Sequence, residues 1–197
     1  MKITSILLTI LFTGVCQADV IKVAVLDSGI QWFKAKDIKL CETGHKDFTG
    51  EGLGDSKENR YHGTNIAGII GNIAKQDYCI IVLKVFGDKT NPVKWTENAI
   101  NWAIKQNVSV INYSGGSFDS SFTEKIAIQK ALDSGILVVA AAGNNKTNID
   151  KLPFYPASYD KRIIVVGNGI KAKNRVKTSN YGKIVDVWVK GVNITAL

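Results

Sequence analysis

The sequence contains few of the residues that bind metal ions, and it lacks the motifs that bind nucleotides. Its 197 residues include two histidines and three cysteines. Neither Cys41 nor Cys79 has a partner histidine at the spacing of a zinc site. No Gly-x-Gly-x-x-Gly or P-loop motif follows a predicted strand, so a nucleotide-binding α/β domain is a poor interpretation. From these absences we expect no cofactor.

Acidic residues are scarce relative to basic ones. The chain has 25 lysines and arginines against 17 aspartates and glutamates, for a formal net charge of +8. Such an excess can attract nucleic acid or an anionic surface. The basic residues are scattered, however, and no recognition motif accompanies them, so we predict no nucleic-acid partner. Hydrophobic residues make up 45% of the chain, and this length suits one globular domain.

The first 18 residues are typical of a secretory signal peptide. A positive start is followed by an apolar run over Ile6–Phe12 and by small residues at critical cleavage positions, which predicts cleavage before Asp19. The apolar run is too short for a stable membrane anchor. We therefore expect a secreted or periplasmic protein without stable membrane insertion. An alternative is a lipoprotein attached through Cys16, although Val15 is not the usual small residue before such a cysteine.

Removal of the signal peptide would leave Cys41 and Cys79 in an exported chain. Disulfides form and persist in such compartments. The sequence allows two interpretations of this pair, a disulfide or two free buried thiols.

Apolar β-branched runs alternate with amphipathic stretches, as in βα units around a parallel sheet. Near-continuous hydrophobicity in the runs predicts strands that are buried on both faces. The predicted strands cover residues 21–26, 38–41, 79–85, 108–112, 136–141, 163–166 and 184–189. The predicted helices cover residues 63–75, 95–105 and 122–134, with Gly71 and Gly135 at helix ends. The sequence of residues 43–61 predicts a surface loop.

Three short motifs place polar side chains at the ends of these elements. Asp27 ends a buried strand, His62 opens a helix that is rich in small residues, and Asn144 follows a strand that ends in alanines and a glycine. Each motif alone is more typical of a structural role, because an aspartate or asparagine at such a position usually belongs to a turn. A lone histidine is likewise usually structural or exposed.

Taken together and in this order, the three motifs resemble the catalytic blocks of the subtilase family, the subtilisin-like serine peptidases. The resemblance runs from about Val20 to Leu197, and weaker segments at residues 47–50, 82–87, 110–116, 155–157 and 179–182 support it. It implies an α/β fold with three α/β/α layers and a mostly parallel buried sheet. The peptidase domain would then occupy residues 19–197.

The resemblance also implies a role for each motif in a serine endopeptidase acting on polypeptides. Asp27 would orient the imidazole of His62, which would act as general base and then as general acid, and Asn144 would donate to the oxyanion. Other residues would contact the substrate. One segment would pair with its backbone and another would border a side-chain pocket: Ser114, Gly115 and Gly116, then Ala141, Ala142 and Gly143.

The sequence departs from the family pattern in lacking a Gly-Thr-Ser block, which carries the nucleophile, so we nominate no nucleophile. We expect a domain that is incomplete at its C-terminus and leaves apolar surface uncovered. Two interpretations remain: a truncated endopeptidase, or an inactive pseudopeptidase that acts at most as a peptide-binding module. A structural calcium ion would follow from the resemblance alone, because no dense Asp-rich loop argues for one.

Overall fold

The protein folds around an eight-stranded sheet, as seen in a computed structural model that describes residues 20–35, 37–55, 60–75, 77–88, 93–171 and 174–194. The signal peptide predicted at residues 1–18 and the chain end at 195–197 lie outside the described residues. The elements are β1 Ile21–Asp27, β2 Lys46–Asp47, α1 His62–Ile73, β3 Tyr78–Lys84, α2 Val93–Lys105, β4 Val110–Tyr113, α3 Phe122–Asp133, β5 Leu137–Ala141, β6 Ile164–Lys171, β7 Asn174–Arg175 and β8 Val187–Lys190.

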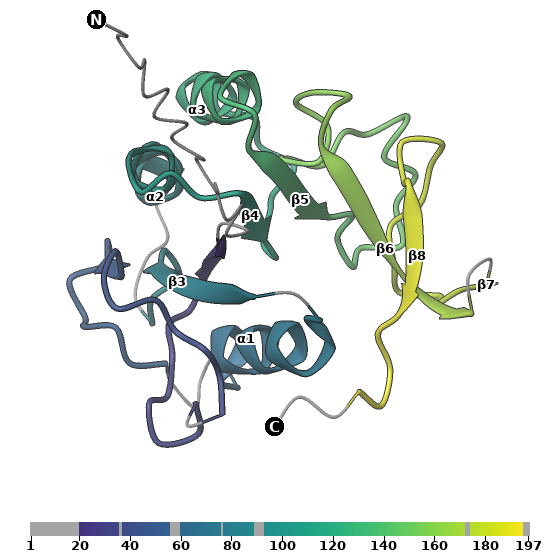
Figure 1. The fold of residues 1–197 in the computed structure, drawn as a ribbon. Helices are drawn as coiled ribbons and strands as arrows, with labels where there is room; N and C mark the ends of the chain where they lie inside the picture. The colour runs from purple at the N-terminus through teal and green to yellow at the C-terminus, as the bar shows by residue number, and fades with distance from the viewer. Residues whose placement is uncertain are drawn as a thin grey trace, which may run out of the picture.

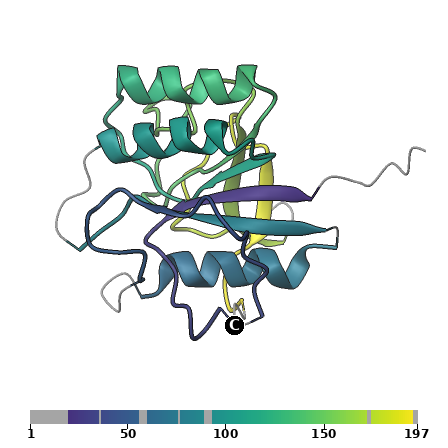
Figure 2. The same ribbon diagram turned by 60° about the vertical axis from the view of Figure 1, so that its left-hand side comes forward.

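The strands follow the order β2-β3-β1-β4-β5-β6-β7, with β8 paired to β6. Every pairing is parallel except that of β6 with β7. Figure 2 shows α2 and α3 on one face of the sheet and α1 on the other. The α/β class and the three layers expected from the sequence are therefore confirmed.

Alternate residues of β1 point into two separate apolar cores. Ala24 and Leu26 belong to the larger core beneath α2 and α3, whereas Val23 and Val25 belong to the smaller core beneath α1. Burial on both faces explains the near-continuous hydrophobicity of this strand. The arrangement fixes β1 in the interior, and Figure 1 shows it between β3 and β4.

The strand predicted at residues 38–41 is wrong, because this segment forms only a single bridge from Leu40 to Ile80. Further along the same edge of β3, the imidazole of His45 bonds to the backbone of β3 where a neighbouring strand would otherwise do so. Its Nδ1 accepts the backbone N–H of Val82 at 3.0 Å, and its Nε2 lies 2.8 Å from the carbonyl oxygen of Cys41. Since Nδ1 accepts, Nε2 must carry the proton and donate. His45 therefore has a structural role. Beyond it, the same edge of β3 pairs with the short strand β2.

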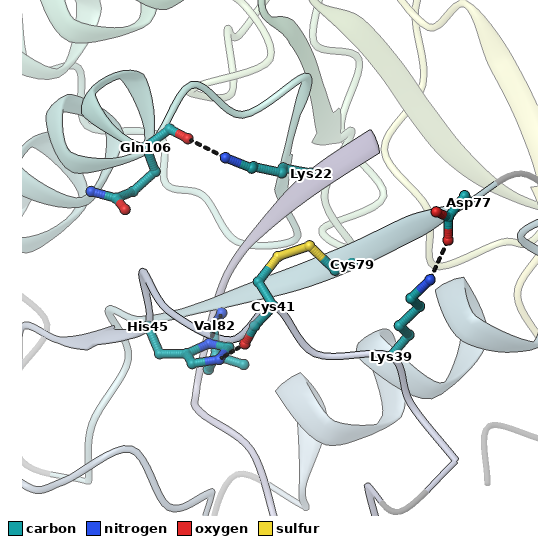
Figure 3. Close-up of a disulfide and its surroundings, with 8 residues drawn as sticks. All are labelled: Lys22, Lys39, Cys41, His45, Asp77, Cys79, Val82 and Gln106. Atoms are coloured by element: carbon teal, nitrogen blue, oxygen red, sulfur yellow. Dashed lines mark hydrogen bonds and ion pairs between the residues drawn. A yellow bond between two sulfur atoms is a disulfide. The ribbon is translucent and has the colours of Figure 1, made fainter. Parts of the chain in front are cut away.

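Cys41 and Cys79 form a disulfide that ties this irregular segment to β3 (Figure 3). Of the two interpretations left open by the sequence, the structure therefore contains the bridge.

The remaining differences between the predicted and the observed elements concern the ends of helices and strands and the shortest strands. The helix predicted from Gly63 to Lys75 runs from His62 to Ile73, so Gly71 lies inside it, whereas Gly135 follows α3 in a left-handed conformation as expected. The two-residue strands β2 and β7 carry too little periodicity to be predicted. The strand predicted at residues 184–189 begins later, as β8.

One face of the sheet is partly uncovered. Val138 and Ala140 of β5 are buried in the core beneath α2 and α3, so Leu137 points to the side of α1 and is 42% exposed. Val187 and Val189 of β8 are 43% and 45% exposed. Exposed apolar surface was expected, and these side chains supply it. No helix in the described residues is long and apolar enough to cross a membrane.

Candidate active site

Asp27 is the last residue of β1 and is buried, with 2% of its surface exposed. Its Oδ1 accepts three hydrogen bonds: from the N–H of Ser28 at 2.8 Å, from the hydroxyl of Ser28 at 3.2 Å and from Nδ1 of His62 at 2.7 Å. Its Oδ2 is also buried, and no described residue bonds to it. The carboxylate is thus fixed by its neighbour in sequence and aimed at the imidazole.

His62 is the first residue of α1, and its side chain is 53% exposed. The hydrogen bond to Asp27 raises the pKa of His62 above its usual value; burial opposes this, and the charges of Asp27 and Asp55 add to it. In the neutral ring Nδ1 keeps its proton for Asp27, so Nε2 holds a lone pair. Nothing in the described part of the chain bonds to Nε2, which leaves it able to accept a proton.

Gly63 lets the start of α1 approach the end of β1. A Cβ at this position would lie 2.4 Å from the carbonyl oxygen of Gly29 and 3.2 Å from Cβ of Asp27. The N–H of Gly63 donates to the hydroxyl of Ser28 at 3.0 Å, which in turn donates to Asp27. The absence of a side chain therefore keeps His62 within reach of the carboxylate.

Asp55 is a site residue that sequence reasoning missed. It is buried, and its Oδ2 accepts the backbone N–H of Thr64 at 3.0 Å and the hydroxyl of Thr64 at 2.8 Å. It thereby caps the first turn of α1 and adds negative charge near His62. The usual capping position belongs to Tyr61, so no local pattern could have indicated this distant cap.

A cavity of about 490 Å³ lies at the ends of β4 and β5. Five of the six predicted substrate-binding residues line it together with Asn144: Ser114, Gly115, Gly116, Ala141 and Gly143. Ala142 does not, because it shares the inward orientation of Ala140 and is buried in the core at 1% exposure. The alternation of side chains along β5 and into the next residue explains why Ala142 faces the core.

Five further lining residues were not predicted: Ser117, Phe118, Asp119, Asn145 and Phe154. Phe118 and Phe154 form an edge-to-face pair with ring centroids 5.2 Å apart. Phe154 directly precedes the weak motif at residues 155–157, so extending that motif by one residue would have found it.

Asn180 holds the loop that carries Asn144. Its side chain accepts the backbone N–H groups of Asn145 at 2.8 Å and Thr147 at 3.0 Å, and it donates to the carbonyl oxygen of Ala142 at 2.8 Å. Asn180 is fully buried, whereas Asn144 is exposed and lines the cavity. The sequence marked residues 179–182 only as a landmark, and the structure gives Asn180 a positioning role.

The order of the strands brings the motifs that follow β1, β4 and β5 to one edge of the sheet. Leu26 of β1 is in register with Tyr113 of β4, and Tyr113 with Ala140 of β5. The three strands are parallel neighbours, so their carboxyl ends lie at the same edge, with about 10 Å from β1 to β5. A proton acceptor at His62 and an amide at Asn144 are therefore set at the same edge of the sheet.

Among the described residues, no group of three histidine, cysteine, aspartate or glutamate side chains could hold a metal ion. The chemistry that this site offers is acid–base chemistry by an oriented imidazole, next to a cavity that can receive a side chain.

Comparison with known proteins identifies the family. The model of the Subtilase family matches residues 18–197. The chain is 33% identical over 189 residues to the major intracellular serine protease of Bacillus subtilis (strain 168), covering 88% of this chain and 59% of that protein. It is 33% identical over 186 residues to subtilisin of Bacillus pumilus, and the match covers 88% of this chain and 66% of that protein.

A solved lanthipeptide protease is similar to this chain with a TM-score of 0.74 and 26% identity, covering 87% of this chain and 55% of the protease. The chain thus spans roughly half to two-thirds of the length of these relatives. The family match over nearly the whole chain, together with an aspartate–histidine pair at the edge of a parallel sheet, shows that this chain belongs to the subtilase family of serine peptidases.

Proposed function

We propose that this chain carries the acid–base pair and the substrate cleft of an exported serine endopeptidase. The observation that carries the proposal is the 2.7 Å hydrogen bond from Nδ1 of His62 to Asp27. It holds the ring so that Nε2 can take a proton from a serine hydroxyl and return it to the leaving amine. Family membership and the neighbouring cavity support the same assignment.

Residues of the cleft have complementary proposed roles. Among the described residues, none bonds to the peptide groups of Gly115 and Gly116, which leaves them free to pair with an extended peptide. Asn144 would donate its amide to the oxygen of the tetrahedral intermediate. Gly143 and Ala141 would border the substrate side chain in the cavity. These roles fit hydrolysis of a peptide bond within a polypeptide.

Export is a separate part of the proposal. The disulfide between Cys41 and Cys79 supports it, because such bonds persist in oxidising compartments. Mass spectrometry of the protein recovered outside the cytoplasm should give an N-terminus at Asp19. A mature protein that keeps its first 18 residues, or one retained in the cytoplasm, would contradict this part.

A second candidate function is peptide binding without turnover. It is favoured by one observation: the described residues already form a cleft, with Ser114, Gly115 and Gly116 along its wall. A single experiment separates the two functions. The product of the natural gene is treated with a fluorophosphonate probe. In the labelling reaction, a serine oxygen displaces fluoride from phosphorus and the histidine takes the proton of the serine hydroxyl.

An endopeptidase should be labelled by the probe and should cleave casein, and His62→Ala should abolish both. A protein that ignores the probe yet binds extended peptides with measurable affinity would instead be a binding module. If neither labelling nor peptide binding occurs, both functions are wrong.

A further inference from the structure

The acid–base pair is assembled from two separate segments, the one that follows β1 and the one that begins α1. Asp27 belongs to the first segment and His62 to the second, so their hydrogen bond requires that the two segments keep a fixed relative position. The contacts of Gly63 join the segments next to the pair. A second connection lies farther along both segments, and Gln31 makes it.

Gln31 uses both its backbone and its side chain in this connection. It follows Asp27 by four residues and is half-buried. Its backbone N–H donates to the hydroxyl oxygen of Thr64 at 3.0 Å, two residues beyond His62. Its side-chain Nε2 donates to the backbone carbonyl oxygen of Asp55. One residue after β1 therefore contacts both the first turn of α1 and the loop residue that caps this turn.

Gln31, Thr64 and Asp55 form a closed set of hydrogen bonds. The hydroxyl of Thr64 donates to Oδ2 of Asp55 at 2.8 Å, and the N–H of Thr64 donates to the same oxygen at 3.0 Å. Thr64 and Asp55 are 0% and 3% exposed, so the bonds lie away from solvent. Loss of the amide of Gln31 would remove a donor from the carbonyl of a buried residue, which costs more free energy than the same loss at the surface.

The side-chain amide of Gln31 is not required for the turn in which it lies. Lys34 and Ala35 each donate a backbone N–H to the carbonyl oxygen of Gln31 at 3.0 Å, and any residue at position 31 could accept these bonds. Every amino acid except proline would also supply the N–H that Thr64 receives. The glutamine side chain therefore adds one specific feature, an anchor for the loop that carries Asp55.

We infer that Gln31 is a positioning residue: its side-chain amide holds Asp55 where the carboxylate can cap α1. The capped helix in turn keeps His62 against Asp27. The inference rests on the proposed function only for the use of this pair in hydrolysis. Because Gln31 acts through Asp55, its effect on the pair must largely disappear when the cap is removed.

Gln31→Met tests this inference, because methionine has a similar length and volume but cannot donate a hydrogen bond. Hydrogen exchange at the amide of Thr64, followed by NMR, should become at least about tenfold faster. The pKa of His62, measured by NMR titration, should fall toward its usual value. It should fall because the hydrogen bond to Asp27 and the charge of Asp55, which both raise it, are weakened.

A double variant separates positioning from a general loss of stability. In the Asp55→Ala background, Gln31→Met should change the exchange rate at Thr64 by less than about twofold, because the cap through which it acts is already absent. Gln129→Met is the matched control. Gln129 is also half-buried but belongs to α3, on the other face of the sheet from α1 (Figure 2), and its substitution should change neither measurement.

Circular dichroism checks that each variant is folded. If Gln31→Met does not fold, Gln31→Asn serves as the second variant, because its amide is one methylene short of the carbonyl, and it should have the same two effects. Equal effects of the substitution with and without Asp55, or an unchanged pKa of His62, would overturn the inference. Neither measurement needs turnover, so a failure of probe labelling and peptide binding would count against the proposed function alone.

Discussion

At the scale of single residues, the site depends on a glycine that allows close approach. Gly63 lies against the backbone of Gly29 and the side chain of Asp27, so any side chain at residue 63 must push α1 away from β1. The 2.7 Å bond between Asp27 and His62 spans this contact. One methyl group is therefore enough to disturb both stability and the acid–base pair.

Gly63→Ala is predicted to lower the free energy of unfolding by about 1–3 kcal/mol, the usual cost of overpacking. Urea denaturation followed by circular dichroism measures this change. Gly54→Ala is the matched control, because a Cβ there meets nothing within 4 Å, and it should change stability by less than about 0.5 kcal/mol. Equal effects of the two substitutions would show that the contact does not constrain α1.

At the scale of elements, α1 depends on a carboxylate from a distant loop. Asp55 accepts the N–H and the hydroxyl of Thr64, whereas Tyr61, at the capping position, makes no side-chain cap. The free N–H groups of a helix start are stabilised by such an acceptor. The orientation of His62 thus depends on the loop as well as on β1.

Asp55→Ala should destabilise the protein by about 1–2 kcal/mol and speed hydrogen exchange at the amide of Thr64. It should also bring the pKa of His62 closer to its usual value, because the charge of Asp55 contributes to the upward shift. Asp133→Ala, which removes an exposed carboxylate, is the control and should leave both measurements nearly unchanged. Unaltered exchange at Thr64 in Asp55→Ala would contradict the capping role.

At the scale of the whole molecule, the disulfide connects the edge segment of the sheet to β3 across a separation of 38 residues. In the chain-entropy account, closing a loop of this length destabilises the unfolded state by about 4 kcal/mol. The double variant Cys41→Ala/Cys79→Ala and the reduced wild-type protein should both lose stability by about this amount in urea denaturation. If the double variant and the reduced wild-type protein are as stable as the oxidised protein, the disulfide does not stabilise the edge segment of the sheet.

Elements with strong apolar periodicity could be predicted from the sequence, whereas segments whose structure is set by long-range contacts could not. The buried strands β1 and β3 could be predicted because both of their faces need apolar residues. The contacts of His45 with Val82 and of Asp55 with Thr64 join residues 37 and 9 positions apart in sequence, and no helix or strand pattern encodes them.

At the centre of the site, the carboxylate of Asp27 holds the imidazole of His62 as an acid–base pair. Because the pKa of His62 is raised in the folded state, its protonated form is favoured there. That contribution to stability is complete below the usual pKa of 6.5 and is lost as pH rises through the folded pKa. Proton acceptance at Nε2, and any hydrolysis that needs it, should correspondingly increase as pH rises through the same value.

NMR titration of the imidazole signals measures this pairing directly, because the chain has only two histidines and His62→Gln identifies the signal of His62. We predict that His62 titrates above pH 6.5 in the wild-type protein and at a clearly lower pH in Asp27→Asn. A His62 signal that titrates at or below the usual pKa, or that does not move in Asp27→Asn, would contradict the account.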